Sequence, residues 1–145
     1  MTVLNLGCGY DSEGFGIDIN PKFNPDIVAD ICKPLPIKYK FDVVKAIEVL
    51  EHVYNPRMLI NNMLKYVKYD GIYIITTPNS LGYEISYRFH GKKKINDSVF
   101  QYLTPCVIKG LINRCGSIVV YQNIGSRFWF KHIKIKFKQK VWLKR

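Results

Sequence analysis

The sequence predicts a single α/β domain built on a doubly wound, mainly parallel β-sheet. Short β-branched apolar runs alternate with loops and helix-like stretches over the first two thirds of the chain. These runs are almost continuously apolar, as expected for parallel strands that are buried on both faces. With 145 residues, of which 48% are hydrophobic, the chain can bury one sizeable core.

Six strands and two helices are expected. The strands are placed at residues 3–6, 16–19, 26–29, 42–46, 71–77 and 117–121. The first helix should begin at Asn55-Pro56, a favourable N-cap and N1 pair, and continue until Asp70-Gly71. The second helix should run from Thr104 to Cys115. Residues 32–40 contain two prolines and three lysines, which predicts a loop across one end of the sheet.

The end of the chain allows two interpretations. Residues 127–145 contain eight basic residues and no acid, interleaved with aromatic and aliphatic side chains. Ile133, Ile135 and Phe137 alternate with lysines as in a strand, but Phe130, Ile133, Phe137 and Val141 also fit one face of a helix. We therefore assign the domain to residues 1–126, and treat 127–145 as a basic aromatic tail that either docks on an anionic partner or forms the last strand.

Charge is concentrated in the second part of the chain. Residues 1–87 hold 8 Lys/Arg and 10 Asp/Glu, whereas residues 88–145 hold 14 Lys/Arg and one acid. Such a basic half predicts contact with an anionic membrane surface or with nucleic acid, unless it is only a solvated surface. We find neither an apolar run of transmembrane length nor a signal peptide, so we expect a cytoplasmic protein with reduced thiols, peripheral to the membrane if the tail docks there.

A glycine turn follows the first predicted strand. Leu4-Asn5-Leu6 leads into Gly7-Cys8-Gly9, and Asp18 ends the next strand. Glycines at this place let a ligand approach the backbone, and an acid at the end of the second strand can accept both hydroxyls of a ribose. The third glycine of the dinucleotide motif is missing, because Ser12 occupies its position. The pattern indicates a nucleoside site rather than a nicotinamide enzyme.

Further motifs follow in a fixed order. They are Gly16-Ile17-Asp18-Ile19, Ala29-Asp30-Ile31, Leu35-Pro36, Phe41-Asp42-Val43-Val44, Glu48-Val49-Leu50-Glu51-His52-Val53, Asn55-Pro56, the run from Gly71 to Asn79, and Phe100-Gln101-Tyr102-Leu103-Thr104-Pro105. Together with the glycine turn, this series resembles the class I S-adenosylmethionine-dependent methyltransferases of the methyltransferase type 11 group, over about residues 3–122. The resemblance implies an enzyme with a Rossmann-like methyltransferase fold and S-adenosylmethionine as cofactor.

The resemblance also implies roles for individual residues. The backbone around Gly7 and Gly9 would lie against the methionine part of the cofactor, Asp18 would hold the ribose, and Asp30 would receive the adenine amino group. The loop that follows the fourth strand would pass under the sulfonium. The cofactor-binding residues implied in this way are Asn5, Gly7, Cys8, Gly9, Asp18, Ile19, Asp30, Ile31 and Ala46.

The chain departs from this family in its first crossover. Only six residues separate Gly9 from Gly16, whereas a parallel crossover with a helix needs about 10–12 residues or more. We therefore expect a bare loop or a single turn here. The helix N-terminus that would help to bind the cofactor carboxylate would then be missing, and a second copy of the chain in a homo-oligomer could supply cover.

Glu48 and His52 are the candidate catalytic residues. They stand four apart, so on a helical turn they would share a face at the edge of the sheet. The imidazole could take the proton of the methyl acceptor. The Glu-x-x-Glu-His pattern also resembles the magnesium site of ubiquinone-pathway and small-RNA methyltransferases, but the ligand set is incomplete, so we assign no metal. A purely structural role, with Glu48 as a cap and His52 packed, is the alternative.

The methyl acceptor is constrained but not identified. The Asn/Asp-Pro-Pro-Tyr motif of enzymes that methylate base amino groups is absent after Val44, which favours an oxygen or a carbon acceptor. His90 and residues 92–94 lie where the family shapes its acceptor pocket; they would suit a phosphate-bearing substrate, and a solvated loop is the alternative. Three functions stay open: a methyltransferase for a small or lipid-linked acceptor, which we favour, a nucleic-acid methyltransferase, and a non-catalytic methyltransferase-like binding protein.

Overall fold

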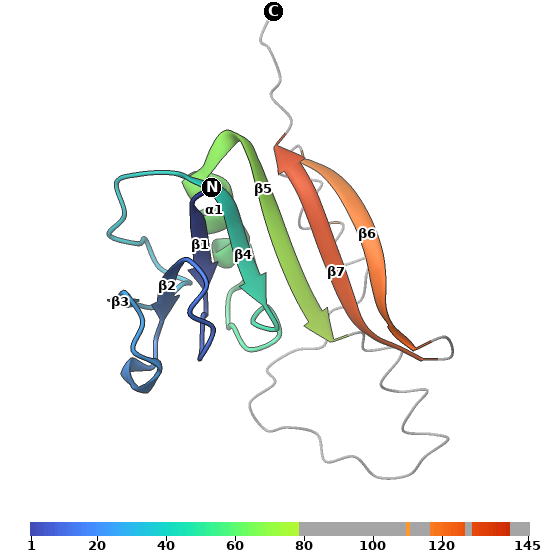
Figure 1. Cartoon of the computed structure of the whole chain (residues 1–145), viewed down its shortest axis with the longest axis horizontal. Helices are drawn as coiled ribbons and strands as arrows, with labels where there is room; N and C mark the ends of the chain where they lie inside the picture. Colours follow the sequence, from blue (N-terminus) through green and yellow to red (C-terminus); the bar gives the residue numbers. More distant parts are fainter. Residues whose placement is uncertain (79–109, 111–116, 127–128, 140–145) are drawn as a thin grey trace, which may run out of the picture.

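A computed structural model describes residues 1–78, 110, 117–126 and 129–139 of the chain. Within these residues, the protein forms one seven-stranded sheet in the order β3-β2-β1-β4-β5-β7-β6 (Figure 1). The elements are β1 (Val3–Leu6), β2 (Phe15–Asp18), the 3-10 helix η1 (Pro21–Phe23), β3 (Ile27–Val28), β4 (Phe41–Ile47), α1 (Pro56–Tyr66), β5 (Val67–Pro78), β6 (Ser117–Ser126) and β7 (Trp129–Gln139).

Strands β1 to β5 run parallel to one another, so their carboxyl ends lie at the same edge of the sheet. Strand β7 is antiparallel to both of its neighbours, β5 and β6. Strand β7 therefore runs against the other six strands, and β6 at the edge of the sheet is again parallel to β5. This arrangement confirms the predicted α/β class with a mainly parallel sheet.

The connection between β1 and β2 contains no helix, as its length predicted. Residues 7–14 form turns and bends that lead directly into β2. Gly7 N donates to Ile17 O at 2.7 Å, and Asp11 N donates to Cys8 O at 2.9 Å, so the loop folds back on itself beside β2. The glycine turn is consequently held by backbone hydrogen bonds and side chains instead of by a helix.

Helix α1 begins as expected but ends earlier. The side chain of Asn55 caps the helix by accepting from Met58 N at 3.1 Å, and Pro56 follows at N1. The expected end at Asp70-Gly71 is wrong, because Val67 already has an extended backbone and pairs with Phe41 of β4. Strand β5 thus starts four residues before the predicted strand. Sheet pairing outweighs the helical spacing of Val67 at this point.

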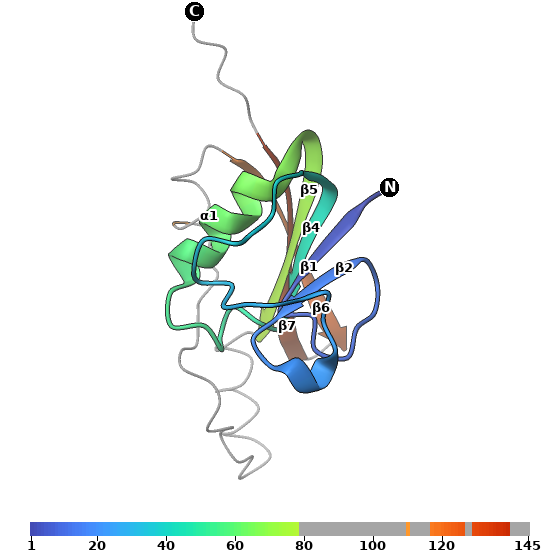
Figure 2. The same cartoon turned by 90° about the vertical axis from the view of Figure 1, so that its left-hand side faces the viewer.

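The main core lies between the sheet and α1, which covers one side of the sheet (Figure 2). Leu59, Ile60 and Met63 of α1 join fully buried strand residues in one cluster. Members of the cluster contributed by the strands include Leu4, Leu6, Ile17, Val44, Ala46, Tyr73 and Ile75. These side chains recur at every second position along β1, β4 and β5, which is the period of a strand with one face on the core.

The predicted loop over residues 32–40 is present and packs against α1. Asn62 Nδ2 donates to Ile31 O and Lys33 O, both at 2.8 Å, and Tyr66 Oη donates to Leu35 O at 2.8 Å. These bonds satisfy loop carbonyls that become buried beside the core. Two polar side chains of α1 therefore fix a segment that has no secondary structure of its own.

The last segment of the chain forms a strand where the structure describes it. Residues Trp129–Gln139 are β7, in register with β5 from Ile72↔Lys138 to Pro78↔His132. The helical alternative is wrong for these residues, since pairing with two strands satisfies the backbone on both sides. Docking of residues 127–145 on an anionic partner stays a prediction, but most of this segment is an internal strand.

Several expectations fall outside the described residues. They concern the second helix, apart from the helical Gly110, the loop with His90 and residues 92–94, and the motif that starts at Phe100. No helix in the described part of the chain is long and apolar enough to span a membrane.

Candidate functional site

The glycine turn lies at the carboxyl end of β1 and has the backbone that only glycine adopts easily. Gly7 has a φ of 70° and Gly9 a φ of 52°. A Cβ on Gly7 would lie 2.7 Å from Val49 Cγ2, in the segment after β4, whereas a Cβ on Gly9 would meet nothing within 4 Å. Gly7 is thus required for close packing, and Gly9 leaves open space beside the turn.

Asp18 ends β2 directly beside this turn, as predicted. Its side chain is buried, and its two carboxylate oxygens accept from different backbone groups. Gly9 N donates to Oδ2 at 3.0 Å, and Asn20 N donates to Oδ1 at 2.9 Å. An ionised carboxylate offers about four acceptor sites, so both oxygens can still accept from a ligand.

Asp30 and Ile31 follow β3 at the same edge of the sheet. Asp30 Oδ1 accepts from Cys32 N at 2.8 Å, and Oδ2 accepts from Tyr54 Oη at 3.1 Å. Tyr54 belongs to the segment between β4 and α1, so this bond joins two loops of the carboxyl edge. Ile31 is buried, whereas Ile19, the residue after Asp18, is 68% exposed. The exposed Ile19 offers apolar surface beside Asp18.

Three of the predicted cofactor residues point elsewhere or lie deeper. The Asn5 side chain donates to Asp11 Oδ2 at 3.2 Å and does not lie at the end of β1. Ala46 lies inside β4 and is 0% exposed, within the core cluster. Cys8 is buried, and this burial is the main reason why the pKa of its thiol is raised. Of Asn5, Cys8 and Ala46, only Cys8 is part of the glycine turn, and its thiol is buried.

A cavity of about 310 Å³ lies next to the turn. It is lined by Cys8, Gly9, Tyr10, Asp11, Ser12, Gly14, Gly16, Phe23, Asn24, Pro25 and Asp26. Gly9 is shared with the candidate site, but Asp18, Asp30 and Ile31 do not line the cavity. The carboxylates of Asp18 and Asp30 lie at the carboxyl ends of β2 and β3, and the cavity is space beside the glycine turn.

The segment after β4 carries the predicted catalytic residues. It forms a turn, not a helix, in which His52 N donates to Val49 O at 2.9 Å. Glu48 has a φ of 54°, which is unusual for a side chain of this kind, and its N–H donates to Thr76 O and Thr76 Oγ1, both at 3.0 Å. A strained residue held by the neighbouring strand is common at functional sites.

Glu51 is the buried acid of this segment. It is 2% exposed, and Thr77 Oγ1 donates to its Oε2 at 2.9 Å. His52 Nε2 lies 3.8 Å from Glu51 Oε1, and the His52 side chain is 37% exposed. Burial raises the pKa of the Glu51 carboxyl, and the nearby Glu48 adds to this effect. The pattern drew attention to Glu51 as part of a metal motif, but not as the acid that is buried beside His52.

Among the described residues, no group of three or more His, Cys, Asp or Glu side chains is arranged to hold a metal ion. Glu48, Glu51 and His52 are neighbours along one turn of the chain. The arrangement offers one partly exposed imidazole, which can exchange a proton, beside a buried carboxyl group.

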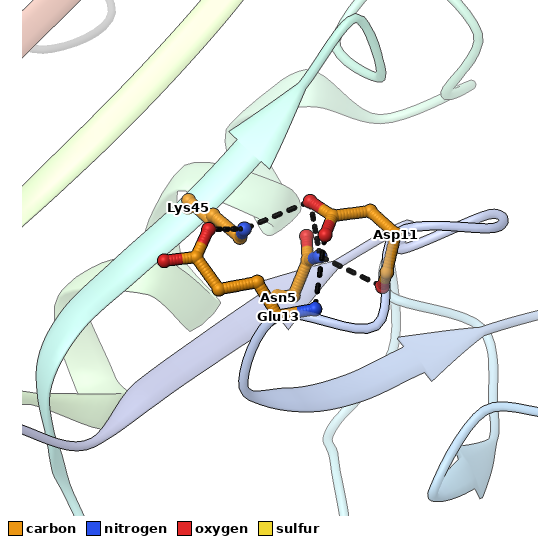
Figure 3. A network of polar contacts seen from close by, with 4 residues as sticks. All are labelled: Asn5, Asp11, Glu13 and Lys45. Atoms are coloured by element: carbon orange, nitrogen blue, oxygen red, sulfur yellow. Dashed lines mark hydrogen bonds and ion pairs between the residues drawn. The ribbon is translucent and has the colours of Figure 1, made fainter.

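The sequence analysis missed an ion-pair network beneath the turn. Lys45 of β4 is 6% exposed and contacts Asp11 and Glu13 of the β1–β2 connection (Figure 3). The signal was present, because one lysine interrupts the apolar run of residues 43–47 in β4. A charged residue at such a position is seldom buried unless it is paired.

Fold and site define a class of protein. A sheet in the order 3-2-1-4-5-7-6, with a glycine turn after β1 and an acid at the end of β2, is that of the class I methyltransferases. The model of the family described as "Methyltransferase domain" matches residues 1–116. The chain belongs to this family, and the predicted class, an S-adenosylmethionine-dependent methyltransferase, is confirmed.

Solved structures share this fold at low sequence identity. An S-adenosylmethionine-dependent methyltransferase from Clostridium acetobutylicum has a TM-score of 0.74 at 10% identity, covering 97% of this chain and 84% of its own. Magnesium protoporphyrin IX methyltransferase from Synechocystis, solved with bound S-adenosylhomocysteine, has a TM-score of 0.72 at 15% identity, covering 97% and 74%.

A small RNA methyltransferase has a TM-score of 0.75 at 17% identity, with 97% of this chain but only 23% of that chain covered. These identities support the fold alone. No curated protein matches the sequence.

Proposed function

We propose that this methyltransferase binds S-adenosylmethionine at the carboxyl edge of β1, β2 and β3, and transfers the methyl group to an oxygen or a carbon of a small or lipid-linked acceptor. The single observation that carries the proposal is the contact of Asp18 with the glycine turn, in which Gly9 N donates to the carboxylate at 3.0 Å. This contact places an acid with spare acceptor capacity beside open backbone.

The residues present fit the cofactor. The open space beside Gly9 admits a ligand close to the backbone, and Asp18 can accept the ribose hydroxyls. Ile19 and Ile31 offer apolar surface in the neighbouring segments, and Asp30 is held near Ile31 by Cys32 N and Tyr54. When bound, the cofactor supplies an electrophilic methyl group on a sulfonium. The chain's own residues bind it, orient it and receive a proton.

His52 is the residue that we assign to proton transfer. It is partly exposed, close to a buried carboxyl group, and follows strand β4 at the edge where the methyl group would lie. In its neutral form, the imidazole can accept a proton from a hydroxyl acceptor as the methyl group is transferred. We assign to Glu48 a role in shaping the same turn, since its backbone is fixed to Thr76.

Apolar surface in the same segment supports a small or lipid-linked acceptor. Ile47 is 39% exposed at the end of β4, and Tyr54 is 64% exposed before α1. Exposed apolar side chains that border a polar site suit an acceptor with an apolar body and one reactive oxygen. The basic half of the chain would favour a nucleic acid or an anionic membrane surface as a further partner, and acceptor tests should include both.

Calorimetric titration with S-adenosylhomocysteine tests the binding step. We expect Asp18→Asn to weaken binding about tenfold or more, because a charged hydrogen bond to the ligand is lost. Asp42→Asn is the matched control: Asp42 also accepts from a backbone N–H, that of Thr2 at 2.6 Å, but it lies at the amino end of β4. Equal affinities for Asp18→Asn and the parent would remove Asp18 from the site.

Transfer of a labelled methyl group tests the catalytic step. A panel of hydroxyl-bearing small molecules, lipid extracts in vesicles and single-stranded RNA serves to find an acceptor. With that acceptor, we expect His52→Ala to lower turnover by about 10²–10⁴-fold, the usual contribution of a general base, while S-adenosylhomocysteine binds as in the parent. Full activity of His52→Ala would leave His52 with a structural role. If the RNA alone were methylated, the acceptor would be a nucleic acid and not a small or lipid-linked molecule.

A further inference from the structure

Lys45 is a buried cation that the proposed reaction does not use. It stands between Val44 and Ala46, which face the core, so its side chain is on the opposite face of the sheet. Its Nζ lies 2.8 Å from Asp11 Oδ2 and 2.6 Å from Glu13 Oε2 (Figure 3). Both acids belong to the helix-free connection between β1 and β2.

The contacts of Lys45 continue to the glycine turn. Asn5, the register partner of Lys45 on β1, donates to Asp11 Oδ2 at 3.2 Å. The backbone of Asp11 donates to Cys8 O at 2.9 Å, inside the turn. Gly9, which follows Cys8 in the turn, donates its backbone N–H to Asp18 Oδ2 at 3.0 Å. A short chain of direct bonds thus leads from Lys45 to the contact on which the cofactor site rests.

The ion pair between Lys45 and Asp11 shifts the pKa of both groups. Burial lowers the pKa of Lys45, but the hydrogen bonds with Asp11 and Glu13 outweigh this effect, and the net shift is upward. The hydrogen bond from Lys45 is the main reason why the pKa of Asp11 is lowered. Both pKa shifts therefore favour the charged forms of Lys45 and Asp11.

We propose that Lys45 is a positioning residue for the cofactor site: through Asp11 and Glu13, it holds the glycine turn in the conformation that binds the cofactor. The connection between β1 and β2 is too short to contain a crossover helix that could hold the glycine turn. The ion pairs of Lys45 with Asp11 and Glu13 hold this connection instead. This inference rests on the proposed function. It adds a residue that contacts neither cofactor nor acceptor and acts through the loop.

If Lys45 only stabilised the fold, its replacement would lower the stability of the domain and leave the affinity of the folded protein for the cofactor unchanged. The side chains of Asp11 and Glu13 are 47% and 71% exposed, so both acids can be hydrated if the lysine is replaced. Removing one partner of an ion pair is strongly destabilising where the remaining charge stays buried, which is not the case for these two exposed acids. A methionine at position 45 should therefore loosen the loop without unfolding the domain.

The test is calorimetric titration of Lys45→Met with S-adenosylhomocysteine, combined with a thermal melt. We expect at least a fivefold weaker affinity, the low end of about 5–150-fold for coupled sites, and a thermal midpoint within about 4 °C of the parent. Lys68→Met is the matched control, because Lys68 Nζ contacts Asp42 Oδ1 at 2.8 Å at the opposite edge of the sheet. This control should bind as the parent does.

Two further variants complete the test. Lys45→Arg keeps the charge and should restore part of the lost affinity. Glu13→Gln changes an exposed partner and should weaken binding by a smaller factor; it decides the question if Lys45→Met does not fold. Parent-like affinity in Lys45→Met, or in Glu13→Gln when the former is unfolded, overturns the inference. A parent protein that does not bind S-adenosylhomocysteine contradicts the proposed function instead.

Discussion

The interior beneath α1 and the carboxyl edge of the sheet are built in different ways. Beneath α1, Leu6, Val44 and Ile75 are 0% exposed and belong to one apolar cluster with the helix. At the carboxyl edge, the chain turns through positive φ angles at Gly7, Gly9 and Glu48, and hydrogen bonds hold Gly9 and Glu48 to neighbouring strands. The difference indicates that the first region supplies stability, whereas the second holds polar groups in place for a ligand.

The largest expected effect tests the interior. Leu59 of α1 is fully buried, so Leu59→Ala should lower the free energy of unfolding by about 2–5 kcal/mol, from lost burial and a residual cavity. Urea unfolding measures this change, and Asn61→Ala, an exposed position on the same helix, is the control. The folded fraction of Leu59→Ala should bind S-adenosylhomocysteine as the parent does. Weaker binding by that fraction would contradict the claim that the interior supplies stability without affecting the ligand site.

A smaller effect is expected for stability where the two regions meet, at Glu51, which is buried and accepts a hydrogen bond from Thr77. Burial raises the pKa of Glu51 above its value in the unfolded chain, so the folded state binds the proton more tightly. The resulting stability is present below the unfolded pKa and is lost as pH rises through the folded pKa. Glu51→Gln lacks this loss, so its stability relative to the parent should increase with pH.

Urea unfolding of Glu51→Gln and the parent at pH 4, 6 and 8 checks this prediction. The amide oxygen of the glutamine can still accept from Thr77, so the comparison isolates the cost of the buried charge. A difference that is constant with pH, or that decreases as pH rises, would show that burial does not raise the pKa of Glu51.

Local patterns predicted most of the fold. Val3–Leu6 forms the first strand as expected, and Asn55 caps α1, because both depend on residues that are close in sequence. The start of β5 and the path of β7 were not determined in this way. Val67 pairs with Phe41, and β7 is inserted between β5 and β6, so these choices depend on partners far along the chain.

The same reasoning separates the predictable part of the site from the rest. The contact between Gly9 and Asp18 joins the ends of adjacent strands, and the family resemblance implied both residues. The pair formed by Lys45 and Asp11 spans 34 positions and became visible only in the structure. Asn5 is a predicted cofactor residue, and its contact with Asp11 of this network also became visible only in the structure.

The most direct test of the account is to map where S-adenosylhomocysteine binds. Titration of the ¹⁵N-labelled protein, followed by amide chemical shifts, reports on every backbone N–H. We predict that the largest shifts occur at Gly9, Asp18 and Asn20 on the carboxyl edge, while the amides of Thr2 and Asp42 at the amino edge stay in place. Saturable shifts confined to the amino edge, or no shifts at all, would contradict it.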